Sequence, residues 1–443
     1  MCGIAGLFGY GASPPAIDPA YLARMTDAMV SRGPDGNGEW ISTDGRAGFA
    51  HRRLSIIDLS DGGAQPMLLD HGRLAITYNG EIYNFQGLRE ELETAGHVFQ
   101  SDSDTEVLLH LYDRDGPEMV GRLRGMFALA IYDRDKKGIF LARDGFGIKP
   151  LYYADDGTTL RFASQVKALR AGGGIDASPS AAGRAGFYVW GYVPEPWTMF
   201  EHIRALPAGS TMWIDGNGAR SPKRYFDVTA ELEAMGGSAA AWTRTDLRDA
   251  LIDTLSHHLI ADVPVGAFLS AGLDSATIVG LASEIQADSL RSVTLAFDEF
   301  DGTQFDESAL AEVIAAHYGT DHHTQWVKGT DFRGEYDRLC MAMDQPSIDG
   351  VNTYFVSKVT AETGLKVAMS GLGGDELFGG YQSFREIPWM TGLLGAVPGM
   401  RCAGRLFRKL SAPIVSAATS PKYASLFEYG TTYADVYLLR RAL

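Results

Sequence analysis

The pattern of apolar runs changes near residue 241, and this change constrains the fold more than any other feature of the chain. Before about residue 170, short β-rich runs alternate with glycine-rich turns, and only two helical stretches interrupt them. Many strands with few helices predict an α+β layered domain. After residue 241, strands and helices alternate, which predicts an α/β domain with a parallel, Rossmann-like sheet. The 443 residues are enough for two such domains.

We place the first domain at 2–215 and the second at 241–443. Residues 171–240 are rich in Gly, Ala, Ser and Pro, and we interpret them as the connection that leads into the second domain. The predicted strands lie at 74–78, 127–132, 138–142, 160–163, 263–269, 292–297, 323–327 and 366–369. The predicted helices lie at 19–30, 85–95, 246–258, 276–284, 307–318 and 353–362.

Charge and cysteine content argue against several classes of function. The formal net charge of −16 argues against a general binder of nucleic acids or membrane surfaces. No stretch approaches the roughly 20 apolar residues that cross a bilayer, and no secretory signal opens the chain, so we expect a soluble protein. Cys2, Cys340 and Cys402 are too scattered for a disulfide framework or a metal cluster, which favours a reducing, cytoplasmic compartment.

Cys2 directly follows the initiator methionine. Removal of Met1 would place the α-amine of Cys2 beside its own thiol, and an amine with a pKa of about 8 can accept the thiol proton at neutral pH. The other interpretation is a small hydrophobic side chain at the start of a strand, and a Met-Cys start alone favours it. The next residues, Gly3-Ile4-Ala5-Gly6, favour the nucleophile, because glycines in a buried strand let other backbone approach closely.

Tyr78-Asn79-Gly80-Glu81 is predicted to end a strand in a turn. An Asn amide and a Gly N–H are the two kinds of donor that an oxyanion hole needs, although a hairpin turn alone explains Asn-Gly better. Arg53 can pair with a carboxylate, and Glu81 and Asp104 can receive an ammonium group. An amino-acid substrate offers both groups.

Five segments, in this order, resemble the glutaminase domain of glutamine-hydrolysing asparagine synthetases: Cys2-Gly3-Ile4-Ala5-Gly6, Ser31-Arg32-Gly33-Pro34-Asp35, Arg53-Leu54-Ser55-Ile56-Ile57-Asp58, Tyr78-Asn79-Gly80-Glu81-Ile82-Tyr83-Asn84 and Arg143-Asp144-Gly145-Phe146-Gly147-Ile148-Lys149-Pro150-Leu151-Tyr152-Tyr153. That domain is a class II, N-terminal-nucleophile amidotransferase with an αββα sandwich. The resemblance implies that Cys2 is the nucleophile and that Asn79 and Gly80 form the oxyanion hole. It also implies that Arg53 holds the α-carboxylate of glutamine, that Glu81 and Asp104 hold its α-amine, and that the main chain of Leu54, Ser55, Ile56 and Ile57 lines the pocket.

The loop Ser270-Ala271-Gly272-Leu273-Asp274-Ser275 follows an apolar strand and precedes a helix. Small residues in such a loop can turn N–H groups toward phosphate. A strand-to-helix turn capped by Asp274 or Ser275 explains the loop equally well. The loop resembles the pyrophosphate-binding loop of ATP pyrophosphatase domains, which implies that these six residues bind ATP. Ala271 replaces the first glycine of that pattern, and its methyl fits if the local φ is negative.

A second glycine-rich segment, Ser370-Gly371-Leu372-Gly373-Gly374-Asp375-Glu376, follows the last predicted strand. We expect both loops at the same carboxyl edge of the sheet, where open α/β folds bind ligands. Asp274 and Asp375 can then share Mg²⁺ bound to ATP, although a turn carboxylate also explains Asp375. The resemblance implies that Phe268 and Leu295 contact the base region, and that Ser370 and Gly371 contact the nucleotide or an acyl-adenylate.

The sequence departs from the family in two places. Characterised members carry a glutamate at the position of Leu372, in the adenylate-intermediate site. Leucine cannot transfer a proton, so that role is vacant or is taken by another residue such as Glu376. The acceptor-binding segment that family chains carry further on is missing, and we expect the second domain to be truncated at its C-terminus.

The resulting hypothesis is glutamine-dependent asparagine synthesis, with glutamine, aspartate and ATP as substrates and Mg²⁺ as cofactor. The main alternative is an amidotransferase of the same fold that amidates another carboxylate, as in natural-product or surface-polymer biosynthesis. A nutrient sensor without turnover and a truncated chain with only glutaminase activity are further alternatives. We expect no nucleic-acid or membrane partner, and the oligomeric state is left open with a homodimer as the candidate.

Overall fold

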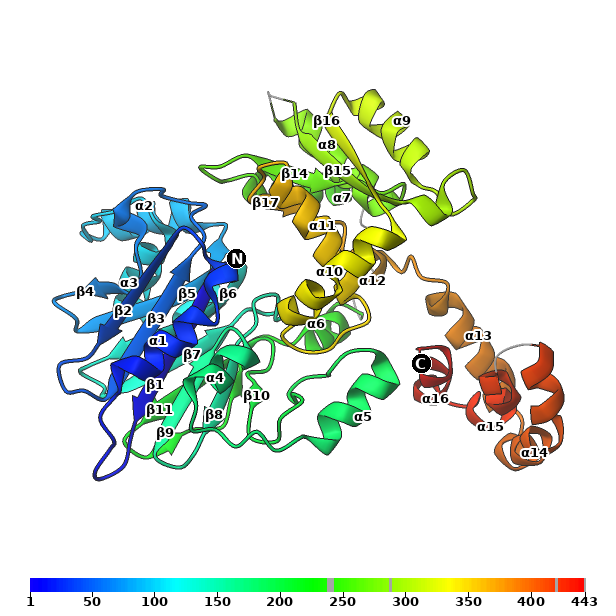
Figure 1. Ribbon diagram of the computed structural model, residues 1–443, viewed down its shortest axis with the longest axis horizontal. Helices are drawn as coiled ribbons and strands as arrows, with labels where there is room; N and C mark the ends of the chain where they lie inside the picture. Colours follow the sequence, from blue (N-terminus) through cyan, green and yellow to red (C-terminus); the bar gives the residue numbers. More distant parts are fainter. Residues whose placement is uncertain (237–242, 287–288, 419–420, 442–443) are drawn as a thin grey trace.

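The computed structural model describes residues 1–236, 243–286, 289–418 and 421–441. The predicted start of the second domain at 241 and the chain end at 443 lie outside the described residues. Figure 1 shows a strand-rich N-terminal part, coloured blue to green, beside a C-terminal part in which helices surround a smaller sheet.

The N-terminal part contains two antiparallel sheets. The first has the order β10-β8-β9-β1-β3-β2, with strands β1 (Gly3–Gly9), β2 (Gly36–Ile41), β3 (Ala47–Arg53), β8 (Tyr152–Asp155), β9 (Thr159–Ala163) and β10 (Arg204–Ala205). The second has the order β12-β11-β7-β6-β5-β4, with β13 paired to β11; its strands are β4 (Met67–Leu69), β5 (Leu74–Ile82), β6 (Gly125–Asp133), β7 (Gly138–Arg143), β11 (Ser210–Asp215), β12 (Gly218–Ala219) and β13 (Lys223–Arg224).

Three apolar clusters hold these layers together. The middle one lies between the sheets and joins residues such as Ile4 and Phe49 of the first sheet to Leu141 of the second. Helices α1 (Pro19–Asp27) and α4 (Val166–Gly172) cover the first sheet, and α2 (Phe85–Thr94) and α3 (Asp104–Asp115) cover the second. This αββα sandwich confirms the fold class predicted for the first domain.

The second domain is built on a parallel sheet with the order β16-β15-β14-β17, formed by β14 (Val265–Phe268), β15 (Arg291–Phe297), β16 (Asp321–Val327) and β17 (Val367–Met369). Helices α7 (Arg244–His258), α8 (Leu273–Ile285) and α9 (Ser308–Tyr318) pack on one face, and α11 (Gly350–Glu362) packs on the other. A parallel sheet with helices on both faces confirms the predicted α/β class.

The remaining helices are α5 (Ala181–Trp190), α6 (Val228–Met235), α10 (Gly329–Ala342), α12 (Gly374–Phe378), α13 (Ser383–Gly395), α14 (Met400–Ala418), α15 (Leu426–Tyr429) and α16 (Tyr433–Arg441). In Figure 1 the helices from α13 onward gather at the end of the molecule far from the N-terminal sheets. Within the described ranges, no helix has the length and apolar composition needed to cross a bilayer.

Several predicted boundaries were wrong. The strand predicted to stop at Tyr78 continues to Ile82, so Asn79 and Gly80 lie in β5 and pair with Ala128 and Phe127 of β6 instead of forming a turn. Helix α8 begins at Leu273 with Gly272 as its N-cap, so neither Asp274 nor Ser275 is the cap. The segment interpreted as a connection contains α5, α6 and four short strands, of which β11 to β13 extend the second sheet.

Candidate active site

Cys2 lies just before β1, where the first sheet faces the loop that follows β3. Its sulfur accepts a hydrogen bond from the N–H of Leu54 at 3.3 Å and lies 3.6 Å from the carbonyl oxygen of the same residue. Burial raises the pKa of the Cys2 thiol, and the Leu54 N–H partly opposes this shift. The thiol is therefore protonated at neutral pH in this environment and needs a base to become a nucleophile.

The N-terminal amine lies in the same buried environment. Met1 still precedes Cys2 in this structure, and burial lowers the pKa of the Met1 amine to about 5. Arg32 and Lys149 lower it further, whereas Cys2 and Glu81 act in the opposite direction. An amine placed here is neutral at pH 7 and can accept a proton.

A pocket opens beside the Cys2 sulfur. Eight of the predicted glutamine-site residues line it: Cys2, Arg53, Leu54, Ile56, Ile57, Gly80, Glu81 and Asp104. Ser55 does not line the pocket, because its N–H points away and donates to Asp35 Oδ2 at 2.8 Å. The sequence did not indicate Gly63, Gln65, Tyr78, Ser103 and Thr105, which also line the pocket.

Two carboxylates stand at one end of this pocket. Asp104 is the first residue of α3, and the preceding Ser103 starts the helix by accepting the N–H of Thr105 at 3.2 Å. Burial raises the pKa of Asp104 to about 6, although the N–H of Ile82 and the hydroxyl of Tyr78 bind its carboxylate. Burial, and then the nearby Asp104, raise the pKa of Glu81 well above its usual range. A cationic group bound between the two carboxylates would relieve this repulsion.

Arg53 stands in the same pocket with its guanidinium already oriented. Its Nη1 donates to the carbonyl of Ser60 at 2.7 Å, and its Nη2 donates to the carbonyl of Asp58. A guanidinium has five N–H donors in a planar fork, so donors remain for a carboxylate ligand. The pocket therefore offers one cation and two carboxylates, which matches the α-groups of a free amino acid.

Asn79 is 1% exposed, and its amide Nδ2 has no hydrogen-bond partner among the described residues. An unpaired buried amide is costly and calls for a ligand or another explanation. Gly80 follows it in β5, at a place where a Cβ atom would lie 2.3 Å from the carbonyl oxygen of Met126. Only glycine fits there, and its position leaves the backbone open toward the pocket.

Two cationic residues near Cys2 were not predicted. Arg32 Nε donates to the carbonyl of Cys2 at 2.9 Å, and its Nη2 is buried without a partner in the described part of the chain. Lys149 is 4% exposed; burial lowers its pKa, while Glu81 opposes this shift. Both residues belong to segments that carried the family resemblance, but nothing in those segments indicated that their side chains approach Cys2.

The two predicted nucleotide loops meet at the carboxyl edge of the second sheet. Strands β14 and β17 pair in parallel, with Ala267 opposite Met369, and each leads directly into its loop. A Cβ atom at Gly371 would lie 2.9 Å from the Cβ of Asp274, and one at Gly374 would lie 2.2 Å from its carboxylate oxygen Oδ2. The loops are therefore in van der Waals contact, and these glycines permit the approach.

Hydrogen bonds between Ser270 and Ser275 join the two ends of the first loop. The Ser275 hydroxyl lies 2.9 Å from the Ser270 hydroxyl and accepts the Ser270 N–H at 3.1 Å. No side chain caps the first turn of α8, so its N–H groups remain available for phosphate. Among the described non-glycine residues, positive φ occurs at Asp58, Asp70, His71 and Lys137 but not at Ala271, so the alanine fits without strain.

The residues predicted for the base and the metal lie around these loops. Phe268 and Leu295 are half-buried and pack against the cluster of Val293, Val359 and Leu365. Asp274 lies against Gly374, while Asp375 Oδ1 turns toward Gly380. The described residues contain no cluster of three or more side chains suited to a metal ion. Two carboxylates on adjoining loops still suit Mg²⁺, which takes most of its ligands from phosphate and water.

Leu372 and Leu273 are 93% and 87% exposed. Leu273 lies in the first loop and Leu372 in the second, next to the contact that Asp274 makes between the two loops. The acidic residue that family members place at Leu372 is absent, and Glu376, in the first turn of α12, accepts a hydrogen bond from the Tyr381 hydroxyl at 3.0 Å. The expectation that Glu376 replaces the missing acid stays a prediction.

Residues 1–226 match the family model of the glutamine amidotransferase domain, and residues 246–439 match that of asparagine synthase. Asparagine synthetase [glutamine-hydrolyzing] 1 of Bacillus subtilis is 37% identical over 390 residues, which are 87% of this chain and 60% of that protein. Putative asparagine synthetase [glutamine-hydrolyzing] 2 of Methanocaldococcus jannaschii is 32% identical over 406 residues, covering 86% and 76%. Amidase chry2 of Gibberella zeae is 29% identical over 409 residues, covering 87% and 60%. The chain thus spans about 60% of the length of the first of these relatives.

Proposed function

The chain belongs to the family of glutamine-hydrolysing asparagine synthetases, and from this premise we propose that it makes asparagine from aspartate, with glutamine as nitrogen donor and ATP as activating substrate. The observation that carries the proposal is the pocket beside the Cys2 sulfur, which is lined by a thiol, an arginine and two carboxylates, and by Gly80, which directly follows the unpaired buried amide of Asn79 in β5. Few ligands other than a free amino acid with a side-chain amide use all of these groups.

The first half-reaction takes place at Cys2 after removal of Met1. Arg53 binds the α-carboxylate of glutamine, and Glu81 with Asp104 binds its α-ammonium group. The α-amine of Cys2 accepts the thiol proton, and the sulfur attacks the side-chain carboxamide carbon. Asn79 Nδ2 and the N–H of Gly80 stabilise the resulting oxyanion. The proton passes to the leaving ammonia, and water then cleaves the thioester to give glutamate and the free thiol.

The second half-reaction takes place where the two loops meet. The N–H groups at the start of α8 and the hydroxyls of Ser270 and Ser275 bind the phosphates of ATP. Asp274 and Asp375 would hold Mg²⁺, which neutralises phosphate charge when bound. The β-carboxylate of aspartate attacks the α-phosphorus of ATP, and diphosphate leaves. Ammonia then attacks the activated acyl carbon to form the amide, and AMP leaves.

Contacts between the domains support the transfer of ammonia from one site to the other. Lys366 Nζ lies 2.7 Å from Asp35 Oδ2, and the same oxygen accepts the Ser55 N–H. Lys366 directly precedes β17, so the segment that enters the second nucleotide loop is tied to the wall of the glutamine pocket.

The experiment that tests the proposal compares the Cys2→Ala variant with the wild-type enzyme. We expect the variant to lose glutamate release from glutamine and to keep AMP release that depends on aspartate and ammonia. Loss of both activities in a folded variant would contradict the assignment of two separate sites.

A second candidate is the amidation of a different carboxylate. The exposed Leu372 favours it, because an apolar side chain stands where family members carry an acid. The relationship to Amidase chry2 also favours it, since the related proteins do not all bear the name asparagine synthetase. AMP release measured against a panel of carboxylates separates the candidates: release without aspartate supports the second, and strict dependence on aspartate supports the first.

The compartment is proposed from the cysteines. All three are free, and Cys340 and Cys402 are exposed. Exposed thiols that form no disulfide suit a reducing cytoplasm. A homodimer stays a prediction.

A further inference from the structure

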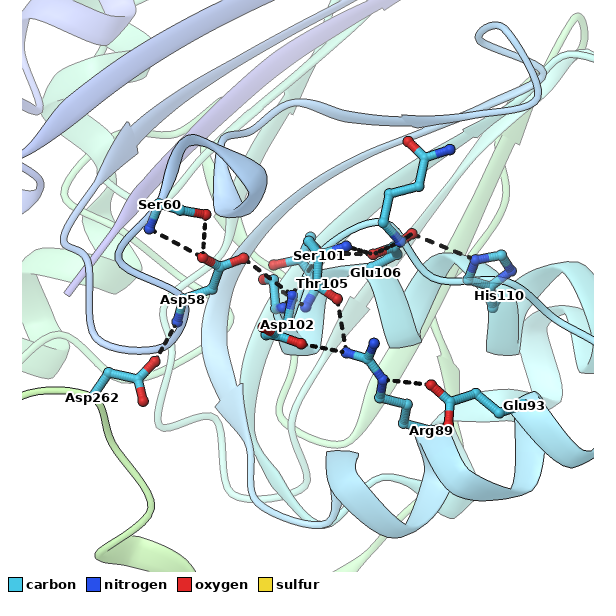
Figure 2. Close-up of polar contacts among 12 residues, drawn as sticks. Asp58, Ser60, Arg89, Glu93, Ser101, Asp102, Thr105, Glu106, His110 and Asp262 are labelled. Atoms are coloured by element: carbon cyan, nitrogen blue, oxygen red, sulfur yellow. Dashed lines mark hydrogen bonds and ion pairs between the residues drawn. The ribbon is translucent and has the colours of Figure 1, made fainter.

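Asp262 of the second domain contacts the wall of the glutamine pocket in the first. Its N–H donates to the carbonyl of Ile56 at 2.9 Å, and its carboxylate oxygen Oδ2 accepts the N–H of Asp58 at 2.7 Å. Figure 2 shows Asp262 reaching Asp58 from the chain that leads into β14. These two bonds hold both ends of the segment 56–58, and Ile56 and Ile57 line the pocket.

Asp58 is held in an unusual backbone conformation. Its φ is +52°, in the left-handed region that non-glycine residues seldom adopt, and it is only 7% exposed. Its carboxylate oxygen Oδ1 accepts the N–H of Ser60 at 3.0 Å, and Oδ2 accepts the N–H of Asp102 at 3.2 Å. Such a conformation persists only where neighbouring groups fix it. The bond from Asp262 is the one that comes from the other domain.

Both charged ends of the glutamine pocket are connected to Asp58. On one side, its carbonyl accepts the guanidinium of Arg53. On the other side, its carboxylate holds the N–H of Asp102, two residues before Asp104 (Figure 2). A shift of Asp58 would therefore change the positions of the groups assigned to the α-carboxylate and to the α-amine of glutamine.

We propose that Asp262 is a positioning residue of the second domain that sets the glutamine affinity of the first by holding Asp58. The inference rests on the proposed function, because it takes glutamine as the ligand of this pocket. Without the Asp262 carboxylate, the N–H of Asp58 loses its acceptor, and the left-handed turn relaxes. Arg53 and the segment before Asp104 then lose their shared support.

The test measures glutamine binding by titration calorimetry in the Cys2→Ala background, which binds without turnover. We expect Asp262→Ala to weaken the glutamine Kd about tenfold, the typical effect of losing a hydrogen bond to a charged group. Asp262→Asn keeps an oxygen acceptor and should stay within about threefold of the parent. In the enzyme with Cys2, Asp262→Ala should raise KM for glutamine more than it lowers kcat, and should leave ammonia-dependent AMP release unchanged.

Asp253→Ala is the matched control. Asp253, which is exposed like Asp262, pairs with Arg124 across the same domain boundary, and neither Asp253 nor Arg124 lines the glutamine pocket. If Asp253→Ala weakens glutamine binding as much as Asp262→Ala, general domain docking explains the effect and the proposal is overturned. Unchanged glutamine affinity in Asp262→Ala also overturns it.

The experiment also distinguishes failure of the proposed function from failure of the variant to fold. If the Cys2→Ala parent binds no glutamine and the wild-type enzyme releases no glutamate, the proposed function itself has failed. If Asp262→Ala does not fold, Asp262→Ser provides the same comparison, because the shorter side chain cannot reach the Asp58 N–H. Its glutamine Kd should then be about tenfold weaker than that of the parent, and parent-like binding would overturn the proposal.

Discussion

At the scale of single residues, Asn79 combines two properties that conflict in a purely structural role. Its side chain is almost completely buried, and its Nδ2 group has no partner among the described residues. A protein gains nothing in stability from such a group. The arrangement makes sense as a donor kept ready for an oxyanion that forms only during the reaction.

The role of Asn79 predicts a selective loss of rate. Asn79→Ala should lower kcat for glutamine hydrolysis by about 10²- to 10³-fold, the usual effect of removing one oxyanion donor, with a much smaller change in KM. Because the substitution also removes an unpaired buried amide, the melting temperature should not fall. Steady-state kinetics and thermal unfolding measure both. A loss confined to KM would assign Asn79 to ground-state binding.

The pair of Glu81 and Asp104 predicts how KM depends on pH. Burial raises the pKa of Asp104 to about 6, so this carboxyl group is ionised above that pH and protonated below it. Its ionised form binds the α-ammonium group of glutamine. KM should therefore rise as the pH falls through about 6.

The value of kcat should fall at a lower pH than the one at which KM rises. Burial lowers the pKa of the Met1 amine to about 5, and after removal of Met1 we expect burial to shift the pKa of the Cys2 α-amine in the same direction. The base thus stays neutral while Asp104 is being protonated. Kinetics at several pH values, with glutamine binding to Cys2→Ala as the control, test this order. A KM that stays constant down to about pH 5 would contradict it.

At the scale of secondary-structure elements, the nucleotide site depends on two strand-to-helix connections that touch. The contact is made where Gly371 and Gly374 of one loop meet Asp274 of the other. Because the two strands pair in parallel, the loops that follow them lie side by side at the same edge of the sheet.

This contact predicts opposite outcomes for two glycine substitutions. Gly374→Ala would place a methyl 2.2 Å from Asp274 Oδ2, so the loops must move apart, and ATP-dependent AMP release should fall more than about tenfold. Gly272→Ala is the matched control: its φ is −72°, and the nearest atom to the new methyl is the Ser270 hydroxyl at 3.2 Å. It should keep most of the activity. Glutaminase activity, measured in parallel, should be unchanged in both. Equal activity of the two variants would contradict the importance of the contact.

The elements also show what the sequence could and could not predict. Apolar runs bounded by turn residues identified β5, β6, β7 and β14, because local preference and burial agree in them. The end of β5 was misplaced since Asn79-Gly80 is a turn signal, and only pairing with β6 keeps it extended. Helix α3 was missed because most of it is buried, so its polar residues do not follow the period of a surface helix.

The same distinction applies to the site. Residue chemistry and the family resemblance predicted Cys2, Arg53, Asn79, Glu81 and Asp104. All of them except Asn79 line one pocket in the structure. Gln65 and Thr105 carried no such signal, and Tyr78 lay in a segment of the resemblance without an assigned role. They serve the site through contacts between distant segments, such as the bond from Gln65 Nε2 to the Thr105 hydroxyl at 3.1 Å. Contacts of this kind depend on the tertiary fold.

At the scale of the whole molecule, the two domains meet where both have functional residues. Arg53, Leu54, Ile56 and Ile57 of the first domain line the glutamine pocket, and the residues just before β14 and β17 of the second domain contact this segment from outside the pocket. No pattern in the sequence pointed to this boundary. Asp262 and Lys366 are ordinary charged side chains, and the partners they contact here lie more than 200 positions away.

Lys366 tests whether this boundary couples the two reactions. Lys366 and Asp35 are partly exposed, so their ion pair contributes about 1 kcal/mol at most, and Lys366→Ala should fold normally. Losing the pair frees Asp35, which also binds the Ser55 N–H beside the pocket. Ammonia should then escape more often, and the ratio of glutamate released to AMP released should rise up to about fivefold, the factor that 1 kcal/mol allows.

The control for this prediction is Lys358→Ala, which removes the pair between Lys358 and Glu362 within α11 without touching the boundary. Both variants lose one surface lysine and one ion pair, so effects of charge alone cancel in the comparison. The ratio of glutamate to AMP should stay at the wild-type value in Lys358→Ala. Equal ratios in the two variants would mean that Lys366 only adds surface charge, and that ammonia is retained by parts of the boundary that do not include the Asp35 pair.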